Sequence, residues 1–341
     1  MNVNISVKIK KINGTIVIMP EIFNNINVEF NNYNVSFEYT NLQFIVRLES
    51  NKLGINDLEN IFWEFYSYLG IILGYFPDII NADFADEKHL AEIVEQYKTK
   101  DCYIRTSEHY IKCMSEDNFK NSFKKFLIIN KKAKFPISMF NVAMMRSMHY
   151  PEISMINILQ SLDGLYEQIY SSRLNSHKIR LQKLEYLKNL LNEKNISVLD
   201  DKEYEKIKNI TLKIDEINFK DKLNFLVDYT KFNVFEYEKQ LLKDNNYSFN
   251  NLLNKFVNTR NKFSHSIDKN NVLNGEESAL YIFKMIMLYR LLIFAEIKII
   301  DLIDEEEFYK NLHEWDKYIH TTLGGENSNV WRSKRIINFN A

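Results

Sequence analysis

Apolar and polar residues alternate along the first fifty positions of the chain, and this period of two is typical of β-strands with one face in the core. Asn13-Gly14 separates the first two of these segments, and this pair favours a type I′ hairpin because both turn residues adopt positive φ. The pattern therefore predicts an antiparallel β-meander with one solvated face. Its inward positions are Val3, Ile5, Val7 and Ile9, then Ile26, Val28 and Phe30, then Val35, Phe37 and Tyr39, and finally Leu42, Phe44, Val46 and Leu48.

The period changes to that of a helix after Asn56, where apolar residues from Leu58 to Leu73 fall on one face. Gly74 follows them and is typical of a helix C-terminus, so we expect one helix that covers the sheet. A further strand-like piece spans 102–114, and a short amphipathic helix that begins near Phe119 comes after it.

The segment 130–136 is predicted to be a basic connection that ends in the helix breaker Pro136, and the period of two disappears beyond it. The sequence thus predicts an α+β protein, with an antiparallel β-meander domain and packed helices at 1–131 and an all-α helical bundle at 132–341. We expect the bundle to be complete without the first domain. Its helices are predicted at 139–148, 155–169, 176–193, 201–215, 219–232, 248–266, 276–302 and 305–321.

The composition agrees with two folded domains and excludes several classes of protein. A chain of 341 residues with 45% hydrophobic and 14% aromatic residues is long and apolar enough for two cores. Its 44 basic and 45 acidic residues nearly cancel, so any site for a polyanion must be local. Cys102 and Cys113 fit neither a disulfide framework nor a zinc site, and we expect both thiols to be reduced.

The protein is expected to be cytoplasmic and to bind no membrane. Its first residues alternate in polarity and lack the apolar core of a signal peptide. The most apolar stretch, 279–300, is interrupted by Lys284, Arg290, Glu296 and Lys298, so a buried helix explains it better than a membrane span.

The predicted helix 248–266 has a polar and an apolar side. Asn254, Asn258, Asn261 and His265 follow one another at spacings of four, three and four residues, which places them on one polar stripe. Arg260 is adjacent in sequence, and its long side chain reaches the same region. Ser248 is a suitable N-cap for this helix. The apolar stripe consists of Leu252, Leu253, Phe256, Val257 and Phe263.

These polar residues have the chemistry that RNA cleavage without a metal requires. A ribose 2′-hydroxyl must lose a proton to attack the phosphorus, the leaving 5′-oxygen must gain one, and the phosphate needs positive charge. His265 is suited to the proton transfers, Arg260 to holding two phosphate oxygens, and Asn261 to orienting either group. Because one histidine cannot easily make both transfers, the chemistry favours a two-fold dimer that brings two such helices together.

The motif Arg260-Asn261-x-x-x-His265 resembles that of the HEPN superfamily, in which Arg, commonly followed by Asn, precedes a His near the end of a helix. The segments 159–167 and 279–300 also resemble the helical bundle of this family, most closely its ApeA-like branch from bacterial anti-phage systems, which carries a β-rich N-terminal domain. The resemblance implies an endoribonuclease that needs no metal or other cofactor. It further implies cleavage of tRNA or bulk transcripts, in a toxin or abortive-infection role, by an enzyme held inactive until infection is sensed.

The resemblance also implies supporting residues and partners. Asp163 and Glu167 lie one turn apart and are expected to orient Arg260, although a surface ion pair explains them equally well, and Asn258 is a further supporting residue. The implied partners are RNA, a second copy of the chain bound through the bundle, and a phage-derived trigger or regulatory partner at the N-terminal domain.

Two other classes of function remain open for the same residues. An Arg and a His at this spacing occur on many helices by chance, and the bundle would then be a catalytically silent module that binds RNA, nucleotide or a protein partner. The third class is a purely structural dimerisation protein. An enzyme needs an accessible His265, whereas a scaffold would bury the Arg260 and His265 side chains in contacts within one chain.

Overall fold

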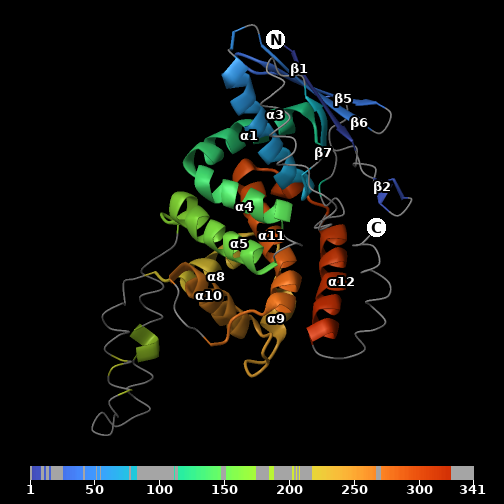
Figure 1. The fold of residues 1–341 in the computed structure, drawn as a ribbon. Coiled ribbons are helices and arrows are strands. Elements are labelled where there is room, and N and C mark those ends of the chain that lie inside the picture. The colour runs from blue at the N-terminus through green and yellow to red at the C-terminus, as the bar shows by residue number, and fades with distance from the viewer. Residues whose placement is uncertain are drawn as a thin grey trace.

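The structure is a computed structural model in which an N-terminal sheet lies at one end of a bundle of helices (Figure 1). It describes residues 26–40, 55–76, 114–146, 151–173, 217–265 and 270–323 as continuous stretches, with shorter pieces at 2–8, 11–12, 15–16, 43–50, 52–53, 78–82, 111, 184–187, 202, 205 and 207.

Five strands form one antiparallel sheet in the order β4-β5-β6-β1-β7. The strands β4, β5 and β6 follow one another as a meander requires, but β1 lies between β6 and β7. A meander through the whole N-terminal part is therefore not confirmed. The strands are β1 (Asn2–Lys8), β4 (Asn27–Glu29), β5 (Asn34–Thr40), β6 (Gln43–Glu49) and β7 (Asp78–Ala82), and β2 (Lys11–Ile12) pairs with β3 (Thr15–Ile16) in a separate two-stranded sheet.

Two helices connect this sheet to the rest of the molecule. The helix α1 (Ile55–Leu73) ends at Gly74, whose φ of 77° confirms the predicted stop. The helix α3 (Glu116–Lys132) packs on β4, where the rings of Phe30 and Phe123 meet edge-on with centroids 5.7 Å apart. The Asn13-Gly14 turn, both cysteines and most of the strand predicted at 102–114 lie outside the described residues.

The basic segment 130–136 is helical on both sides of Ala133, so the prediction that it is a connection ended by a helix breaker is wrong. Only Ala133 separates the end of α3 from α4 (Lys134–Arg146). Pro136 lies in the first turn of α4, where a missing N–H costs nothing because the helix offers it no acceptor. Pro151 likewise begins the next helix. The domain boundary itself, at residues 131 and 132, stays a prediction.

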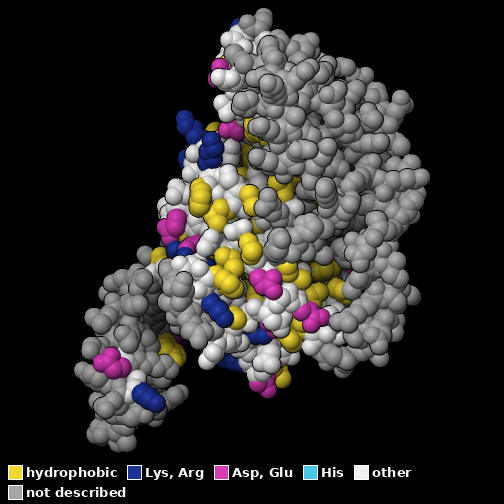
Figure 2. Space-filling model, viewed as in Figure 1, with side chains coloured by type: hydrophobic (Ala, Val, Ile, Leu, Met, Phe, Trp, Pro, Cys, Tyr) yellow, Lys and Arg dark blue, Asp and Glu magenta, His cyan; other side chains and the backbone are white. Residues whose placement is uncertain are grey.

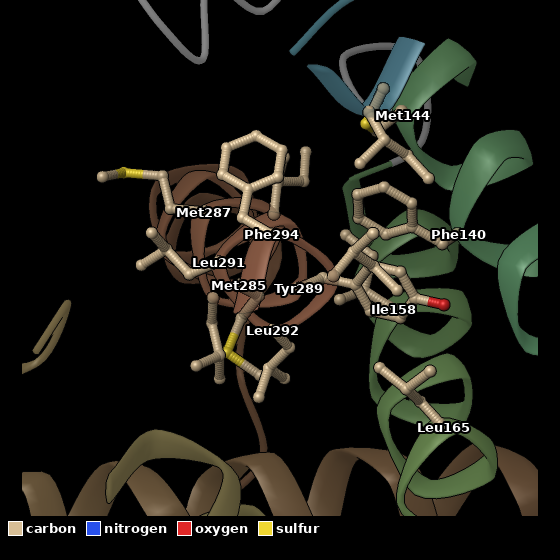
Figure 3. Packing of buried hydrophobic residues seen from close by; sticks show 14 of the residues in the cluster. Phe140, Met144, Ile158, Leu165, Met285, Met287, Tyr289, Leu291, Leu292 and Phe294 are labelled. Atoms are coloured by element: carbon tan, nitrogen blue, oxygen red, sulfur yellow. The ribbon is translucent and has the colours of Figure 1, made fainter. Parts of the chain in front are cut away.

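The centre of the bundle is α11 (Gly275–Ile297), nearly all of whose side chains are buried (Figure 3). Tyr289 stacks on Phe140 of α4 with ring centroids 3.9 Å apart. Among the described residues α11 is the one helix long and apolar enough to cross a membrane, but 89% of its most apolar window is buried by the protein itself. The predicted buried helix is therefore confirmed.

The remaining elements surround α11 (Figure 1). Most of the predicted helices are found with shifted ends, and those predicted at 176–193 and 201–215 lie largely outside the described residues. The elements are α5 (Pro151–Leu165), the π-helix η2 (Tyr166–Tyr170), α8 (Phe219–Tyr229), α9 (Glu236–Gln240), α10 (Phe249–His265), the 3₁₀ turn η4 (Ile300–Leu302) and α12 (Glu305–Leu323).

A buried arginine ties α11 to α1. Arg290 donates from Nε to the carbonyl oxygen of Ile71 at 2.7 Å and from Nη2 to that of Ile72 at 2.8 Å. These carbonyls belong to the last turn of α1, where no N–H of the same helix donates to them. That the bundle is complete without residues 1–131 stays a prediction, and this contact weighs against it, because α11 would lose the acceptors of a buried guanidinium.

A second buried cation joins α9, α11 and α12. Lys284 of α11 donates to both carboxylate oxygens of Glu238 at 2.6 Å and contacts the carboxylate of Asp316 as well. His320 lies on the other side of Glu238, with 3.5 Å between Nε2 and Oε1. This cluster fixes α12 against the bundle.

Candidate functional site

The site is built at the crossing of α5, α8 and α10. Gly164 of α5 allows α4 to approach closely, because a Cβ there would lie 2.7 Å from Cγ of Pro136. Just beyond it, η2 interrupts the α-helical geometry with one π-helical turn that contains Glu167. Such turns are rare and frequently accompany functional sites.

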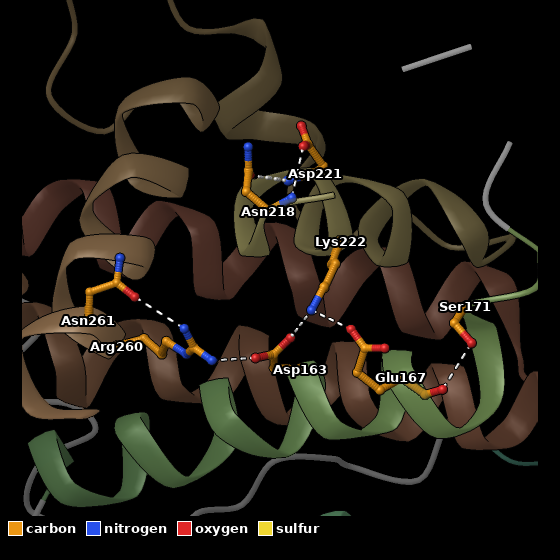
Figure 4. A network of polar contacts seen from close by, with 8 residues as sticks. All are labelled: Asp163, Glu167, Ser171, Asn218, Asp221, Lys222, Arg260 and Asn261. Atoms are coloured by element: carbon orange, nitrogen blue, oxygen red, sulfur yellow. Dashed lines mark hydrogen bonds and ion pairs between the residues drawn. The ribbon is translucent and has the colours of Figure 1, made fainter. Parts of the chain in front are cut away.

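Asp163 binds two cations with its two carboxylate oxygens (Figure 4). Its Oδ2 forms a short ion pair with Nη2 of Arg260 on α10, and its Oδ1 accepts a hydrogen bond from Nζ of Lys222 on α8 at 2.7 Å. The Arg260 and Asp163 side chains are 22% and 15% exposed, so the pair is partly shielded from water. The sequence-predicted residues Asp163 and Arg260 are thus brought together.

Lys222 extends this network to Glu167. Its ammonium lies 2.5 Å from Oε1 of Glu167, whose side chain is 51% exposed, whereas no contact joins Glu167 to Arg260 among the described residues. Burial opposes the charge of Lys222, but hydrogen bonds to Asp163 and Glu167 prevail and raise its pKa above the ordinary value. Glu167 therefore acts on Arg260 only through Lys222 and Asp163.

Two neighbours hold the guanidinium of Arg260 besides Asp163. Its Nη1 donates to Oδ1 of Asn261 at 3.2 Å, and its central carbon lies 5.2 Å from the centroid of the Phe219 ring. Its Nε is buried and has no hydrogen-bond partner among the described residues. The amide nitrogen of Asn261 points away from the guanidinium in Figure 4, so this residue keeps donors for another acceptor.

His265 is the last residue of α10, and its side chain lies outside the described residues. The backbone before it is anchored, because Gln160 of α5 donates to the hydroxyl of Ser264 at 2.8 Å. The end of α10 that carries His265 is thereby tied to the helix that carries Asp163.

The other residues of the polar stripe have structural contacts. Asn258 donates to the backbone carbonyls of Asn270 and Asn271, at 3.2 and 3.3 Å, and so tethers the chain that returns from α10. Asn254 accepts a hydrogen bond from Lys220 at 2.8 Å, and burial lowers the pKa of this lysine. Neither asparagine contacts Arg260.

Two details of α10 differ from the sequence interpretation. Ser248 precedes the helix, and its carbonyl accepts from Leu252 N at 2.9 Å, but its hydroxyl has no partner among the described residues. Phe263 does not belong to the apolar stripe, since it is 52% exposed.

Lys222, Phe219 and Gln160 are parts of the site that the sequence interpretation missed. A signal for the first two was present, because Asn218 and Asp221 form a capping box that begins α8 at Phe219. That signal fixes where α8 starts but not which helix it faces. Ion pairs between helices far apart in sequence are set by packing, which local spacing does not encode.

A hollow of about 490 Å³ lies elsewhere, between α1, α3 and α4. Its lining includes Trp63, Glu64, Asn141 and Lys134 but none of the residues around Arg260. Within the described stretches no three His, Cys, Asp or Glu side chains are grouped closely enough to hold a metal ion.

Comparison with known families finds a match within the helical part of the chain. The Apea-like HEPN family matches residues 156–301, a span that contains Asp163, Lys222, Arg260 and His265. No curated protein and no solved structure matches the chain. Over these residues the chain is similar to ApeA-like proteins of the HEPN superfamily.

Proposed function

We propose that this protein is a metal-independent endoribonuclease of bacterial antiviral defence, with Arg260 and His265 as its catalytic residues. The Apea-like HEPN domain supports a nuclease or RNA-related role in defence. One observation carries the finer proposal. Asp163 holds Arg260 at the crossing of α5 and α10. His265 follows Arg260 by five residues on the same helix and is adjacent to Ser264, which Gln160 anchors.

The proposed reaction is a transesterification within the RNA strand. A histidine removes the proton of a ribose 2′-hydroxyl, the 2′-oxygen bonds to phosphorus, and the bond to the leaving 5′-oxygen breaks as that oxygen gains a proton. The products are a 2′,3′-cyclic phosphate and a 5′-hydroxyl. Arg260 neutralises the phosphate, Asn261 donates from its amide nitrogen, and Asp163 positions the guanidinium without touching the substrate.

The second proton-transfer group comes from a second copy of the chain in this proposal. The partner's His265 would act as acid while the first acts as base, so the site would lie on a two-fold axis. The exposed Phe263 supports an interface near the end of α10, because covering a large exposed ring lowers the free energy of the complex.

The N-terminal part, residues 1–131, is proposed to sense a phage-derived trigger or to restrain the nuclease in the bacterial cytoplasm. The bond between Arg290 and the end of α1 supports this role, since a shift of α1 acts directly on the central helix of the bundle. We propose tRNA as the substrate, with an abortive-infection or toxin outcome for the cell.

A specific observation favours the second candidate, a catalytically silent module that binds RNA. Arg260 already uses both of its terminal nitrogens on Asp163 and Asn261 within one chain. A phosphate must therefore compete with the carboxylate, or bind beside it through the remaining N–H groups.

The test is incubation of the purified protein with total RNA, including tRNA, in the presence of EDTA. We expect fragments with 2′,3′-cyclic phosphate ends that are absent with His265→Ala and reduced at least about tenfold with Arg260→Lys, which keeps the charge but loses the planar fork. Activity that EDTA abolishes and magnesium restores, with 3′-hydroxyl ends, contradicts the chemistry. Binding of RNA without cleavage under all conditions favours the silent module.

A further inference from the structure

The corner between α3 and α4 combines positive charge with an exposed ring. From Asn118 to Tyr150 the sequence contains no Asp or Glu. In a chain with a net charge of −1, this is a strong local excess of positive charge. The basic residues of this segment are Lys120, Lys124, Lys125, Lys131, Lys132, Lys134 and Arg146.

Four residues at the corner itself are exposed: Lys131, Lys132, Lys134 and Phe135. Phe135 is 74% exposed, so most of its ring lies in water. Neither Lys131 nor Lys132 forms an ion pair with any residue in the described part of the chain. Figure 2 shows Lys and Arg side chains gathered beside hydrophobic ones over α3 and α4.

The corner is ordered by its own backbone. The N–H of Ala133 donates to Ile129 O at 2.8 Å, which ends α3, and the N–H of Ile137 donates to Ala133 O at 3.0 Å, which begins α4. The backbone that carries the ring and the ammonium groups is therefore already ordered, so a ligand that binds here orders only the side chains.

The same corner is joined to the candidate site. The hydroxyl of Ser161 on α5 donates to the carbonyl of Pro136 at 2.6 Å, and Pro136 also packs against Gly164. Phe135 is the residue before Pro136, and Asp163 is the residue before Gly164. The Cα atom of each therefore lies about 3.8 Å from that of a residue in the contact between Pro136 and Gly164. The corner is thus packed directly against the turn of α5 that carries Asp163, the partner of Arg260.

We propose that the α3–α4 corner, formed by Lys131, Lys132, Lys134 and Phe135, is a binding surface for single-stranded RNA that guides the substrate toward Arg260. The direction toward Arg260 rests on the proposed function, whereas the RNA-binding surface does not. The lysines contact phosphates and Phe135 stacks on a base. Proteins that bind single-stranded nucleic acid combine these two kinds of contact. Duplex RNA keeps its bases stacked on each other and offers no face to the ring.

The test uses fluorescence anisotropy with a labelled single-stranded RNA oligonucleotide that is 2′-O-methylated at every position. This probe cannot be cleaved by 2′-hydroxyl attack, so the readout is binding alone. The variants are the double substitution Lys131→Gln with Lys132→Gln, and Phe135→Ala. Matched controls remove the same groups elsewhere on the surface: Lys243→Gln with Lys310→Gln, and Leu242→Ala, whose residue is 75% exposed.

We expect the double lysine variant to bind about tenfold more weakly and to lose about 1.4 from the slope of log affinity against log salt, since each phosphate contact contributes about 0.7. Phe135→Ala should weaken binding about tenfold and leave the salt slope unchanged. The controls should bind like the wild type. Thermal unfolding of each variant checks that all of them are folded.

Three outcomes overturn the surface. The first is that corner and control variants bind the oligonucleotide equally, and the second is that duplex RNA binds as well as the single strand. The third is that the wild type binds phosphatidylserine vesicles through these residues and not the oligonucleotide. The proposed function can fail separately. If the corner variants weaken binding but the wild type never cleaves unmodified RNA, the ribonuclease proposal is rejected and the RNA-binding surface is retained.

Discussion

Asp163 of α5 and Arg260 of α10 form an ion pair across 97 residues of sequence, and the same carboxylate also binds Lys222 of α8. One side chain therefore joins three helices at the candidate site. Removing its charge leaves two cations close together with only Glu167, half in water, to balance them. This relationship leads to the first prediction.

Asp163→Asn is expected to lower the free energy of unfolding by about 2 kcal/mol, because two charge-assisted hydrogen bonds are weakened at a partly shielded site. It should also lower the rate of RNA cleavage, since the guanidinium loses its orientation. Glu167→Gln is the matched control and should change stability by less than about 0.5 kcal/mol, because that carboxylate is largely exposed. Urea unfolding measures both, and equal effects of the two substitutions contradict the central role of Asp163.

Mixed dimers test whether two chains share one site. If a site needs His265 from both copies, equal amounts of wild type and His265→Ala should leave about one quarter of the activity of the same total amount of wild type, because about half of the dimers are mixed. If each chain works alone, about one half should remain. The measurement is cleavage of a labelled RNA after the two proteins have been unfolded and refolded together.

Gly164→Ala is expected to destabilise the protein although alanine favours helices. The added Cβ would lie 2.7 Å from the rigid ring of Pro136, and such overpacking costs about 1–3 kcal/mol against a propensity gain of about 1 kcal/mol. Gly275→Ala is the control, because its Cβ would meet only the mobile carboxylate of Glu152. That variant should be as stable as the wild type, and a comparable loss for both variants would show that α4 yields to the methyl group.

The cluster around Lys284 predicts a dependence of stability on pH. Burial raises the pKa of Asp316 to about 6, although Lys284 opposes this, and the pKa in the unfolded chain is about 3.9. A raised acid pKa means that the folded state binds the proton more tightly. The stability contributed by protonation is therefore present below about pH 4 and is lost as the pH rises through about 6.

Asp316→Asn, which is neutral at every pH, should thus be more stable than the wild type by about 2 kcal/mol at pH 7.5 and equally stable near pH 4. Glu238, whose pKa is lowered, has the opposite dependence and is present in both proteins, but its charge helps to raise the pKa of Asp316, so the difference reports the coupled pair. Asp301→Asn, at an exposed residue, is the control and should show no such trend. Urea unfolding at both pH values measures the free energy of unfolding of each protein. If Asp316→Asn is less stable than the wild type at pH 7.5, the prediction is wrong.

Local patterns predicted the elements of this fold better than their connections. The alternation at Ile26, Val28 and Phe30 returns as three buried residues between exposed ones, because the strand period is a local property of the backbone. Pro136 and Pro151 misled the interpretation, since proline stops a helix in its interior but is tolerated in its first turn. The position of β1 between β6 and β7 depends on pairing across the sheet, which no local spacing encodes.

The candidate site follows the same division. Arg260 and Asn261 were identifiable because they belong to one motif on one helix, and Asp163 because the resemblance to the HEPN superfamily implied a role for it. Lys222 was missed because its importance arises only when α8 is packed between α5 and α10. Phe263 was assigned to the core by its spacing, but its side chain is 52% exposed, because the spacing alone does not say which face of α10 is covered.

The two hydrogen bonds from Arg290 to the end of α1 also determine how the molecule comes apart. If the N-terminal part melted first, two buried donors would lose their acceptors while still out of reach of water, so partial unfolding is the costly route. Heating should therefore produce a single calorimetric transition, and the enthalpy from its shape should equal the enthalpy from its area. A partner that binds the N-terminal part would then raise the melting temperature of the whole chain, since neither part can unfold while the other stays intact.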